Sequence, residues 1–360
     1  MMTAQQLSGT TTKATTNLAK TADAYRQLLI QTPALRIRNA AANLNVSELE
    51  LLLTGVSANI TVLRNEPQAI LEKIETLGEV MALTRNDHVV HERHGVYSNM
   101  SFERHGPMHL GLAVNPDIDL RLFLNSWHHA IAVQEDSAHG TRHSLQFFDN
   151  TGMAVHKIYL TKKSDVHAYT GLVKHFALGS DLADLILAKP AAPAAIRPDS
   201  EIDVEGLQAA WRELKDTHDF HLLLKKFSVD REQALRLVSG EFARKVGNDV
   251  VQNVLMAARD KHCEIMVFVG NRGCIQIHTG PVEQLVPQGP WFNVLDPLFN
   301  LHVNDTACAN CYVTYKPTVD GMVTAVECFA ADGELTLTLF GKRKPGIPEL
   351  ELWREIVASV

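Results

Sequence analysis

Two histidines, His218 and His221, are the clearest candidates for a functional role in this sequence. They lie in KDTHDFHLLLKKF, residues 215–227, where the apolar residues recur at helical spacing. Residues three apart are neighbours on a helix, so these imidazoles can contact one metal ion or grip one larger ligand. The same spacing also fits a histidine packed in the core beside Trp211. The residues by themselves leave these alternatives open.

A second group of histidines occurs in the N-terminal half, in RNDHVVHERHG. In a strand, His88 and His94 would share one face while His91 faced the other, so the group does not form an obvious single metal site. His105 and His109 follow shortly afterwards. A histidine cluster at the exposed edge of a loop is the simpler interpretation.

The five cysteines all lie in the C-terminal half: Cys263, Cys274, Cys308, Cys311 and Cys328. An odd number of cysteines without a signal peptide is typical of a reducing cytoplasm. The pair in Cys308-Ala-Asn-Cys311 is a lone CxxC within a strand-like run. Buried thiols are a better interpretation of it than a zinc or redox site.

Composition narrows the class of protein. The chain has 360 residues, which predicts about two domains, and 46% hydrophobic and 21% charged residues, as in a soluble protein. A net charge of −7 disfavours a nucleic-acid binder. The longest apolar runs fall short of the roughly 20 residues of a membrane span, so no membrane insertion is expected. The first residues lack the apolar region of a secretory signal, so residues 1–22 are predicted to be a disordered tail.

The sequence indicates an internal duplication. A Pro- and Ala-rich linker, residues 187–203, separates an N-terminal repeat, 23–186, from a C-terminal repeat, 204–360. In one gapless register Glu79, Met81, Asn86 and Gly95 align with Glu264, Met266, Asn271 and Gly280. NPDIDLRLFL (115–124) aligns with DPLFNLHVN (296–304), and FFDNTG (147–152) with CFAADG (328–333). The last pair predicts a strand-joining turn in each half.

Each repeat has the same order of elements. A helical opening is followed by a second helix, by short alternating strands such as EIMVFVG and LTLTLFG, and by a closing helix. The opening helix of the C-terminal repeat includes both His218 and His221, and its second helix covers residues 231–260. Grouped strands and grouped helices predict an α+β fold with two homologous halves, each an antiparallel β-sheet with flanking helices.

Several long motifs resemble the cytoplasmic hemin-degrading and heme-trafficking family of bacterial heme uptake systems. They are DIDLRLFLN (117–125), SLQFFDNTG (144–152), EIMVFVGNRGCIQI (264–277), YKPTVDGMVT (315–324) and the WRxLxDTH run. The resemblance covers residues 24 to 360, and the family is itself a tandem duplication. It implies that heme is the cofactor, that His218 binds its iron, and that Arg121 lies on the opposite side of the ring. Arginine keeps its proton, so Arg121 would hold an iron-bound water or hydroxide by hydrogen bonds.

The resemblance also implies how the rest of heme would be held. Arg231, Lys316 and Arg343 match the positions that pair with the propionates, and a guanidinium can bind a carboxylate through two hydrogen bonds. Phe268 would supply an apolar wall. Relatives often have tyrosine where Phe340 stands, so a phenolic hydrogen bond would be missing here.

Two further histidines are candidate heme contacts under the same resemblance. Some relatives have one histidine on the helix, so His221 would be a second position for the iron when His218 releases it. His91 would be the contact for a second heme in the N-terminal half.

Two functions follow from the resemblance. In the first, the protein takes up imported heme in the cytoplasm and degrades it to release iron, with heme oxygenase-like activity. In the alternative, it is a non-catalytic chaperone that sequesters heme and delivers it to a separate heme oxygenase. The implied partners are heme, that heme oxygenase and the inner-membrane heme importer, with no nucleic acid, and the protein would be a monomer or a homodimer. A heme-sensing regulator is disfavoured by the acidic charge.

Overall fold

The computed structural model describes residues 18–360 except 138–139, 180–184, 186, 193–194, 239 and 345. In the N-terminal half of this part the α-helices are α1 (Leu18–Gln31), α2 (Ile37–Leu44), α3 (Glu48–Leu53), α4 (Pro67–Ile74) and α5 (Val166–Phe176). In the C-terminal half they are α6 (Val204–Arg212), α7 (Phe220–Phe227), α8 (Arg231–Leu237), α9 (Val250–Asp260) and α10 (Glu351–Ala358). No helix of the described residues is both long and apolar enough to cross a membrane.

The strands form two nine-stranded antiparallel sheets. The N-terminal half contributes β1 (Asn59–Leu63), β2 (Gly78–Arg85), β3 (Val89–Gly95), β4 (Met100–His105), β5 (Met108–Val114), β6 (Asp119–Phe123), β7 (His129–Ser137), β8 (Gly140–Phe148) and β9 (Ala154–Ser164). The C-terminal half contributes β10 (Ala243–Val246), β11 (Ile265–Gly270), β12 (Cys274–Gly280), β13 (Leu285–Gln288), β14 (Trp291–Asp296), β15 (Phe299–Asn304), β16 (Asn310–Thr318), β17 (Gly321–Phe329) and β18 (Leu335–Gly341).

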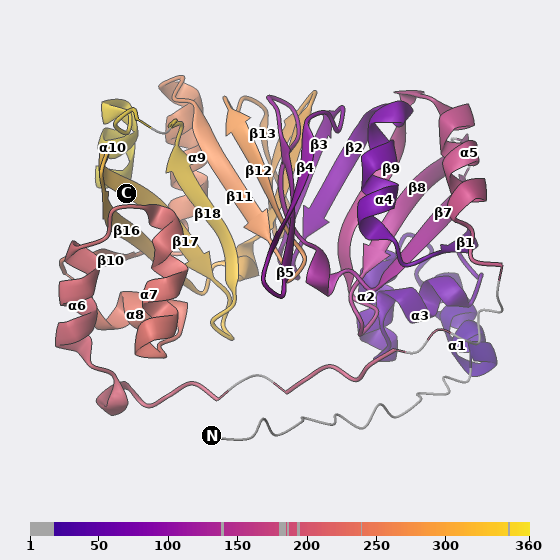
Figure 1. The fold of residues 1–360 in the computed structure, drawn as a ribbon, viewed down its shortest axis with the longest axis horizontal. Helices are drawn as coiled ribbons and strands as arrows, with labels where there is room; N and C mark the ends of the chain where they lie inside the picture. Colours follow the sequence, from indigo (N-terminus) through magenta and orange to yellow (C-terminus); the bar gives the residue numbers. More distant parts are fainter. Residues whose placement is uncertain are drawn as a thin grey trace.

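The two halves exchange strands. The N-terminal sheet has the order β1-β7-β8-β9-β2-β3-β15-β14-β13, and the C-terminal sheet has the order β10-β16-β17-β18-β11-β12-β6-β5-β4. Each half therefore lends a three-stranded meander to the sheet of the other half, as Figure 1 shows where the two sheets meet. The duplicated antiparallel α+β fold is confirmed, but neither sheet is built by one half alone.

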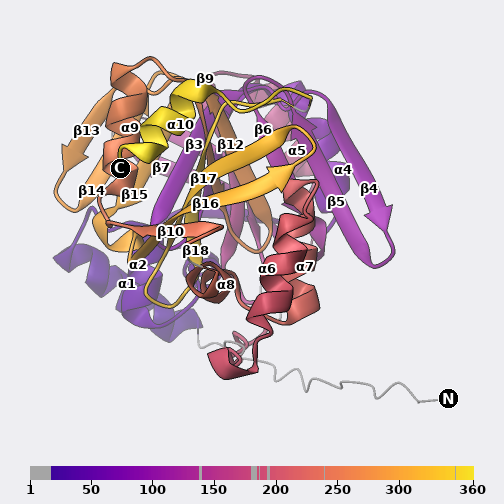
Figure 2. The same cartoon turned by 90° about the vertical axis from the view of Figure 1, so that its left-hand side faces the viewer.

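Helices cover both faces of each sheet at its outer end (Figures 1 and 2). Helices α6, α7 and α8 bury an apolar cluster that includes Trp211 and Phe220 against Tyr312 and Phe329 of the C-terminal sheet. Helices α9 and α10 pack on the other face of that sheet. The N-terminal sheet is covered in the same way by α3 on one face and by α4 and α5 on the other.

The duplication extends to local structure. Helices α3 and α8 both begin with a capping box, formed by Ser47 with Glu50 and by Asp230 with Gln233. In a capping box each partner satisfies a backbone N–H that the helix leaves free. The predicted turns at 149–152 and 330–333 are present, and each has a glycine with positive φ, Gly152 and Gly333.

Repeat-equivalent asparagines join the two halves at the centre. The Asn86 amide donates hydrogen bonds to the carbonyls of Gly270, at 3.3 Å, and of Thr336, at 2.7 Å. Its equivalent, Asn271, donates to the carbonyls of Arg85 and Val155, both at 2.9 Å. These reciprocal bonds tie each sheet to the backbone of the other, which explains why both asparagines keep the same place in the repeat.

Three segments differ from the sequence-based expectation. The helix expected over 231–260 is two helices, α8 and α9, separated by strand β10. The opening helix of the C-terminal repeat is broken between Arg212 and Phe220. Of the expected tail, residues 1–17 lie outside the described residues, and helix α1 begins at Leu18 and buries Ala22. The described parts of the predicted linker, 187–192 and 195–203, contain one short 3-10 helix (Asp199–Glu201).

Acid is expected to destabilise the fold through His278, which is buried where the sheets meet and stacks on Phe299 with ring centroids 3.7 Å apart. Burial, and then the charge of Arg93, lower the pKa of His278 to about 3. The pKa of a histidine in an unfolded chain is about 6.5. The neutral ring therefore contributes its full stability above pH of about 6.5, and at pH 5 about 2 kcal/mol is lost.

Equilibrium unfolding of His278→Phe at several pH values between 7 and 5 tests this prediction. The variant should lose stability less steeply on acidification than the wild type. His105→Gln, at an exposed position, is the control and should keep the wild-type slope. Equal slopes in His278→Phe and the wild type would contradict the prediction.

Candidate functional site

Strand exchange brings Arg121 onto the C-terminal sheet. Arg121, in β6, lies opposite Ile275 of β12, and Ile277 of β12 lies opposite Phe268 of β11. Residues that are opposite one another, or two apart in one strand, share a face of the sheet. Arg121 from one half and Phe268 from the other therefore lie on the same face, which we call the shared face.

Two aromatic rings lie on the shared face. Phe340 of β18 lies opposite Met266, which is two residues before Phe268. The rings of Phe268 and Phe340 meet edge to face, with centroids 5.0 Å apart. Both side chains are half-buried, so they give this part of the sheet an apolar surface.

The histidine segment forms a 3-10 turn that leads directly into helix α7. His218 is in the turn Thr217–Asp219, and His221 is in the first turn of α7. The side chain of His218 is 87% exposed, so the alternative of a core histidine beside Trp211 is wrong. Trp211 is buried and stacks on Phe242 instead.

Both histidines are fixed through the same ring nitrogen. Nδ1 of His218 donates to the Asp216 carboxylate at 2.6 Å, and Nδ1 of His221 donates to the His218 carbonyl at 2.6 Å. Neither acceptor can donate, so each ring carries its proton on Nδ1 and keeps its lone pair on Nε2. A carboxylate behind the ring is how proteins commonly orient a metal-binding histidine. Both imidazoles are therefore competent metal ligands.

Phe220 holds this segment on the shared face. Lys316 of β16 belongs to that face. Thr314 lies opposite Ala325, and Ala325 lies opposite Phe340, so Thr314 is on the shared face. Lys316 is two residues after Thr314 in the same strand and therefore points the same way. The Lys316 ammonium lies 4.5 Å from the centroid of the Phe220 ring. Phe220 itself is buried. The segment that carries the histidines thus packs against the same face that carries Arg121.

A buried carboxylate, Glu327, joins two of the predicted propionate-binding cations. Nε of Arg231 donates to Glu327 at 2.7 Å, and Nζ of Lys316 forms an ion pair with its other oxygen. Thr314 also donates to that oxygen, at 2.9 Å. Burial alone would raise the pKa of Glu327, but Arg231 and Lys316 hold it far below its usual range. Two cations share one anion, so the cluster keeps a net positive charge.

The three predicted cations differ in exposure. The Lys316 side chain is 4% exposed and is committed to Glu327, whereas Arg231 is 33% exposed. Arg343, after β18, forms a long ion pair of 3.9 Å with Asp320. Arg343 is also among the groups that lower the pKa of Asp216, after hydrogen bonds from His218. In this conformation Arg231 and Arg343 are the predicted cations with surface to offer an anion.

His91 lies in the core between the sheets and away from the shared face. It is fully buried, and its ring lies 5.0 Å from that of Phe299. Burial lowers the pKa of His91 well below its usual value, with a smaller contribution from His278. A second heme at His91 stays a prediction, and this packing around Phe299 would have to open to admit it.

The N-terminal half has a cavity that the sequence-based reasoning missed. Its volume is about 2150 Å³, and it lies over the face of the N-terminal sheet that is equivalent to the shared face. Tyr159 lies opposite Met81 there, as Phe340 lies opposite Met266. In the repeat Leu120 aligns with Leu301, so His302 is the equivalent of Arg121. The repeat could therefore have indicated a second site on the N-terminal sheet. Other lining residues are Arg36, Arg38, Arg85, Lys157, Val90 and Trp291.

The fold and the shared face together define a class: a duplicated α+β protein with one sheet face assembled from both halves. Residues 45–176 and 228–360 each match the family described as the haemin-degrading HemS.ChuX domain. The chain is 40% identical over 337 residues to the hemin transport protein HemS of Yersinia enterocolitica. The aligned residues cover 93% of this chain and 96% of HemS.

Solved structures agree with the sequence comparison. The crystal structure of holo-PhuS, a heme-binding protein from Pseudomonas aeruginosa, has a TM-score of 0.90 and 48% identity, covering 95% of this chain and 98% of that one. The structure of ChuS, an E. coli heme oxygenase, has a TM-score of 0.83 and 37% identity, covering 94% of this chain and 99% of that one. The chain belongs to the haemin-degrading HemS/ChuX family.

Proposed function

We propose that this protein binds heme on the shared face and degrades it, with His218 as the iron ligand. The observation that carries the proposal is the paired anchoring of His218 and His221 through Nδ1. This arrangement leaves two Nε2 lone pairs on a segment that packs, through Phe220 and Lys316, against the face that bears Arg121, Phe268 and Phe340. The similar structures described as a heme-binding protein and a heme oxygenase support heme as the bound molecule.

The residues present fit the chemistry of heme. A neutral imidazole is a good axial ligand for heme iron, and both histidines offer one. The rings of Phe268 and Phe340 suit the apolar macrocycle, and the net positive cluster at Glu327, with Arg231 and Arg343, suits the two propionates. Rearrangement at Glu327 would be needed for Lys316 to join them, because its ammonium is enclosed.

Asp216 is expected to strengthen iron binding by orienting His218. Its carboxylate accepts from both the ring and the backbone N–H of His218, at 2.6 and 2.8 Å. Loss of such a partner typically costs about 10–100-fold in metal affinity. Asp216→Asn should weaken hemin binding within this range, as measured by absorbance titration. The exposed Asp219→Asn is the control, and equal affinities in the two variants would contradict the role.

Arg121 is proposed to act on the side of the ring opposite His218. Its guanidinium is paired with Asp119 and is about one-third exposed, so it has donors left for an iron-bound water or hydroxide. Arg121→Ala should retain heme but change the sixth ligand. The absorption spectrum of the ferric complex checks this across a pH series. A spectrum identical to that of the wild type at every pH would remove Arg121 from the site.

Degradation is the activity that we propose. Heme would supply the chemistry: with its iron reduced by an external donor, oxygen or peroxide activated at that iron would attack one of the meso carbons of the ring. The protein orients the ring through His218, holds water or hydroxide through Arg121 and shields one side with the phenylalanines. The test is product analysis with hemin, a reductant and oxygen in the presence of catalase. A defined open-chain tetrapyrrole supports the enzyme, and loss of turnover with catalase would leave only loose peroxide chemistry.

A second candidate is the heme chaperone, which one observation favours. His221 is anchored like His218 and lies three residues away, so the iron has a second ligand to move to during release. A carrier benefits from such an exchange because the bound state need not be lost in one step. Transfer of heme to a separate heme oxygenase, faster in the wild type than in His221→Ala, would support this role.

The cytoplasm is the proposed location, with the inner-membrane heme importer as the source of heme. The support is chemical: all five cysteines are thiols outside disulfides, and all are buried, which suits a reducing compartment.

A further inference from the structure

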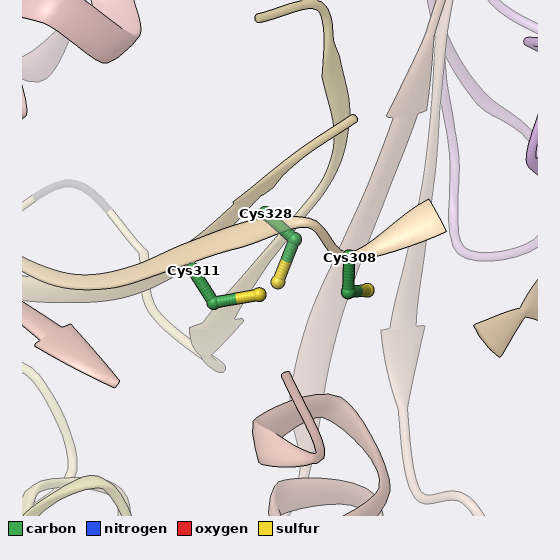
Figure 3. A group of neighbouring side chains, drawn as sticks. All are labelled: Cys308, Cys311 and Cys328. Atoms are coloured by element: carbon green, nitrogen blue, oxygen red, sulfur yellow. The ribbon is translucent and has the colours of Figure 1, made fainter. Parts of the chain in front are cut away.

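Three cysteine side chains, the pair of the CxxC segment and one from the next strand, converge in the C-terminal half. Cys308 follows the 3-10 turn Asp305–Ala307, Cys311 is in β16, and Cys328 is in β17. Their sulfur atoms all lie within 4.8 Å of one another, and Figure 3 shows Cys311 and Cys328 pointing toward each other from paired strands. None of the three residues is more than 3% exposed.

This thiol cluster is separate from the shared face. Cys311 and Cys328 lie opposite each other in the sheet, one position out of step with Tyr312 and Glu327. Because side chains alternate along a strand, the thiols point to the other face, into the apolar core beneath α9 and α10. Changes to the cluster can therefore be made without touching the residues proposed to hold heme.

The separation of the sulfurs is close to that of a three-coordinate metal site. A metal–sulfur bond of about 2.3 Å puts the sulfurs of a trigonal site about 4.0 Å apart. The observed limit of 4.8 Å means that side-chain adjustments of less than about 1 Å would close the site. The three thiols lie just before β16, in β16 and in β17, so a bound ion would tie the β15–β16 connection to both strands of the hairpin.

The donor set selects the kind of metal. Among the side chains that the structure describes, no histidine, aspartate or glutamate joins the three sulfurs. Structural zinc is almost always four-coordinate, whereas soft thiolates also select Cu(I). We propose that Cys308, Cys311 and Cys328 form a three-coordinate site for a soft monovalent cation, Cu(I). Copper–sulfur bonds form as thiol protons leave to solvent, and no atom changes its oxidation state.

The test is an anaerobic titration of the heme-free protein with Cu(I), held by a chromophoric chelator and kept reduced. The wild type should take one Cu(I) per chain from the chelator. Cys311→Ser and Cys328→Ser should bind at least about a hundredfold more weakly, since each removes a ligand and loss of even an outer partner costs 10–100-fold. Cys263→Ser is the matched control, because Cys263 is also buried in this core but lies outside the cluster.

A second measurement needs no variant. X-ray absorption of the wild-type protein loaded with Cu(I) should show three sulfur neighbours and no nitrogen or oxygen. Undiminished binding in Cys311→Ser and Cys328→Ser, or a copper bound by other atoms, would overturn the proposal, as would a wild type that takes no Cu(I) from the chelator. Hemin binding should be unchanged in Cys311→Ser, so failure here is distinguishable from failure of the proposed heme function.

Discussion

The double variant His218→Ala/His221→Ala is expected to lose the saturable Soret band that hemin produces with the wild-type protein. His218→Ala alone should keep a weaker complex with a shifted spectrum, because His221 can replace it as the ligand. The physical reason is that both rings are held with Nε2 as the lone-pair nitrogen. Removing both leaves the iron without an imidazole, and affinity should fall by at least about a hundredfold.

The measurement is an absorbance titration of heme-free protein with hemin, with a stoichiometry near one heme per chain expected for the wild type. Added imidazole should restore the spectrum of the double variant, which separates loss of a ligand from damage to the fold. His105→Ala, an exposed histidine of β4, is the control. If the double variant binds hemin like the wild type, the histidine segment is not the site.

Glu327→Gln is expected to destabilise the heme-free protein by about 3–5 kcal/mol, because it leaves buried cations without their counter-charge. Glu327 is fully buried and pairs with both Lys316 and Arg231. Lys316 is too deeply buried to recover hydration, and burial already lowers its pKa despite the attraction of Glu327. The amide keeps the volume of the side chain, so the effect is electrostatic rather than the creation of a cavity.

Urea unfolding of the heme-free variants at neutral pH measures this change. Glu264→Gln is the control: it breaks a pair with Lys342 in which both side chains are over one-third exposed, and such pairs contribute about 0–1 kcal/mol. A loss below about 1 kcal/mol in Glu327→Gln would mean that the buried cluster rearranges easily. That result would also make it easier for Lys316 to turn toward a propionate.

The candidate site residues were named from long, distinctive motifs, and their roles toward heme stay predictions. Arg121, Phe268 and Phe340 lie on one face because β6, β11 and β18 join the same sheet in register, which no local pattern indicates. The buried ion pairs of Glu327 were not predicted, although a single charged residue between the apolar residues Val326 and Cys328 is a sign of a buried ion pair. The exposure of His218 was not readable, because helical spacing continues through the break between α6 and α7. Helix α6 ends at Arg212, and Asp216 caps the 3-10 turn that follows; this break turns the histidine outward.

The duplication, the antiparallel α+β class and the turns at 149–152 and 330–333 can all be predicted from the amino-acid sequence, because they follow from local patterns and from the alignment of one half with the other. The family follows from the motifs that resemble it. The sheet that each meander joins is known only from the folded chain. An alternating strand has the same pattern whichever edge it pairs with, so β4–β6 and β13–β15 gave no local sign of exchange. That pairing carries Arg121 across to the half that holds His218, because strand edges are chosen by the packing of the whole chain.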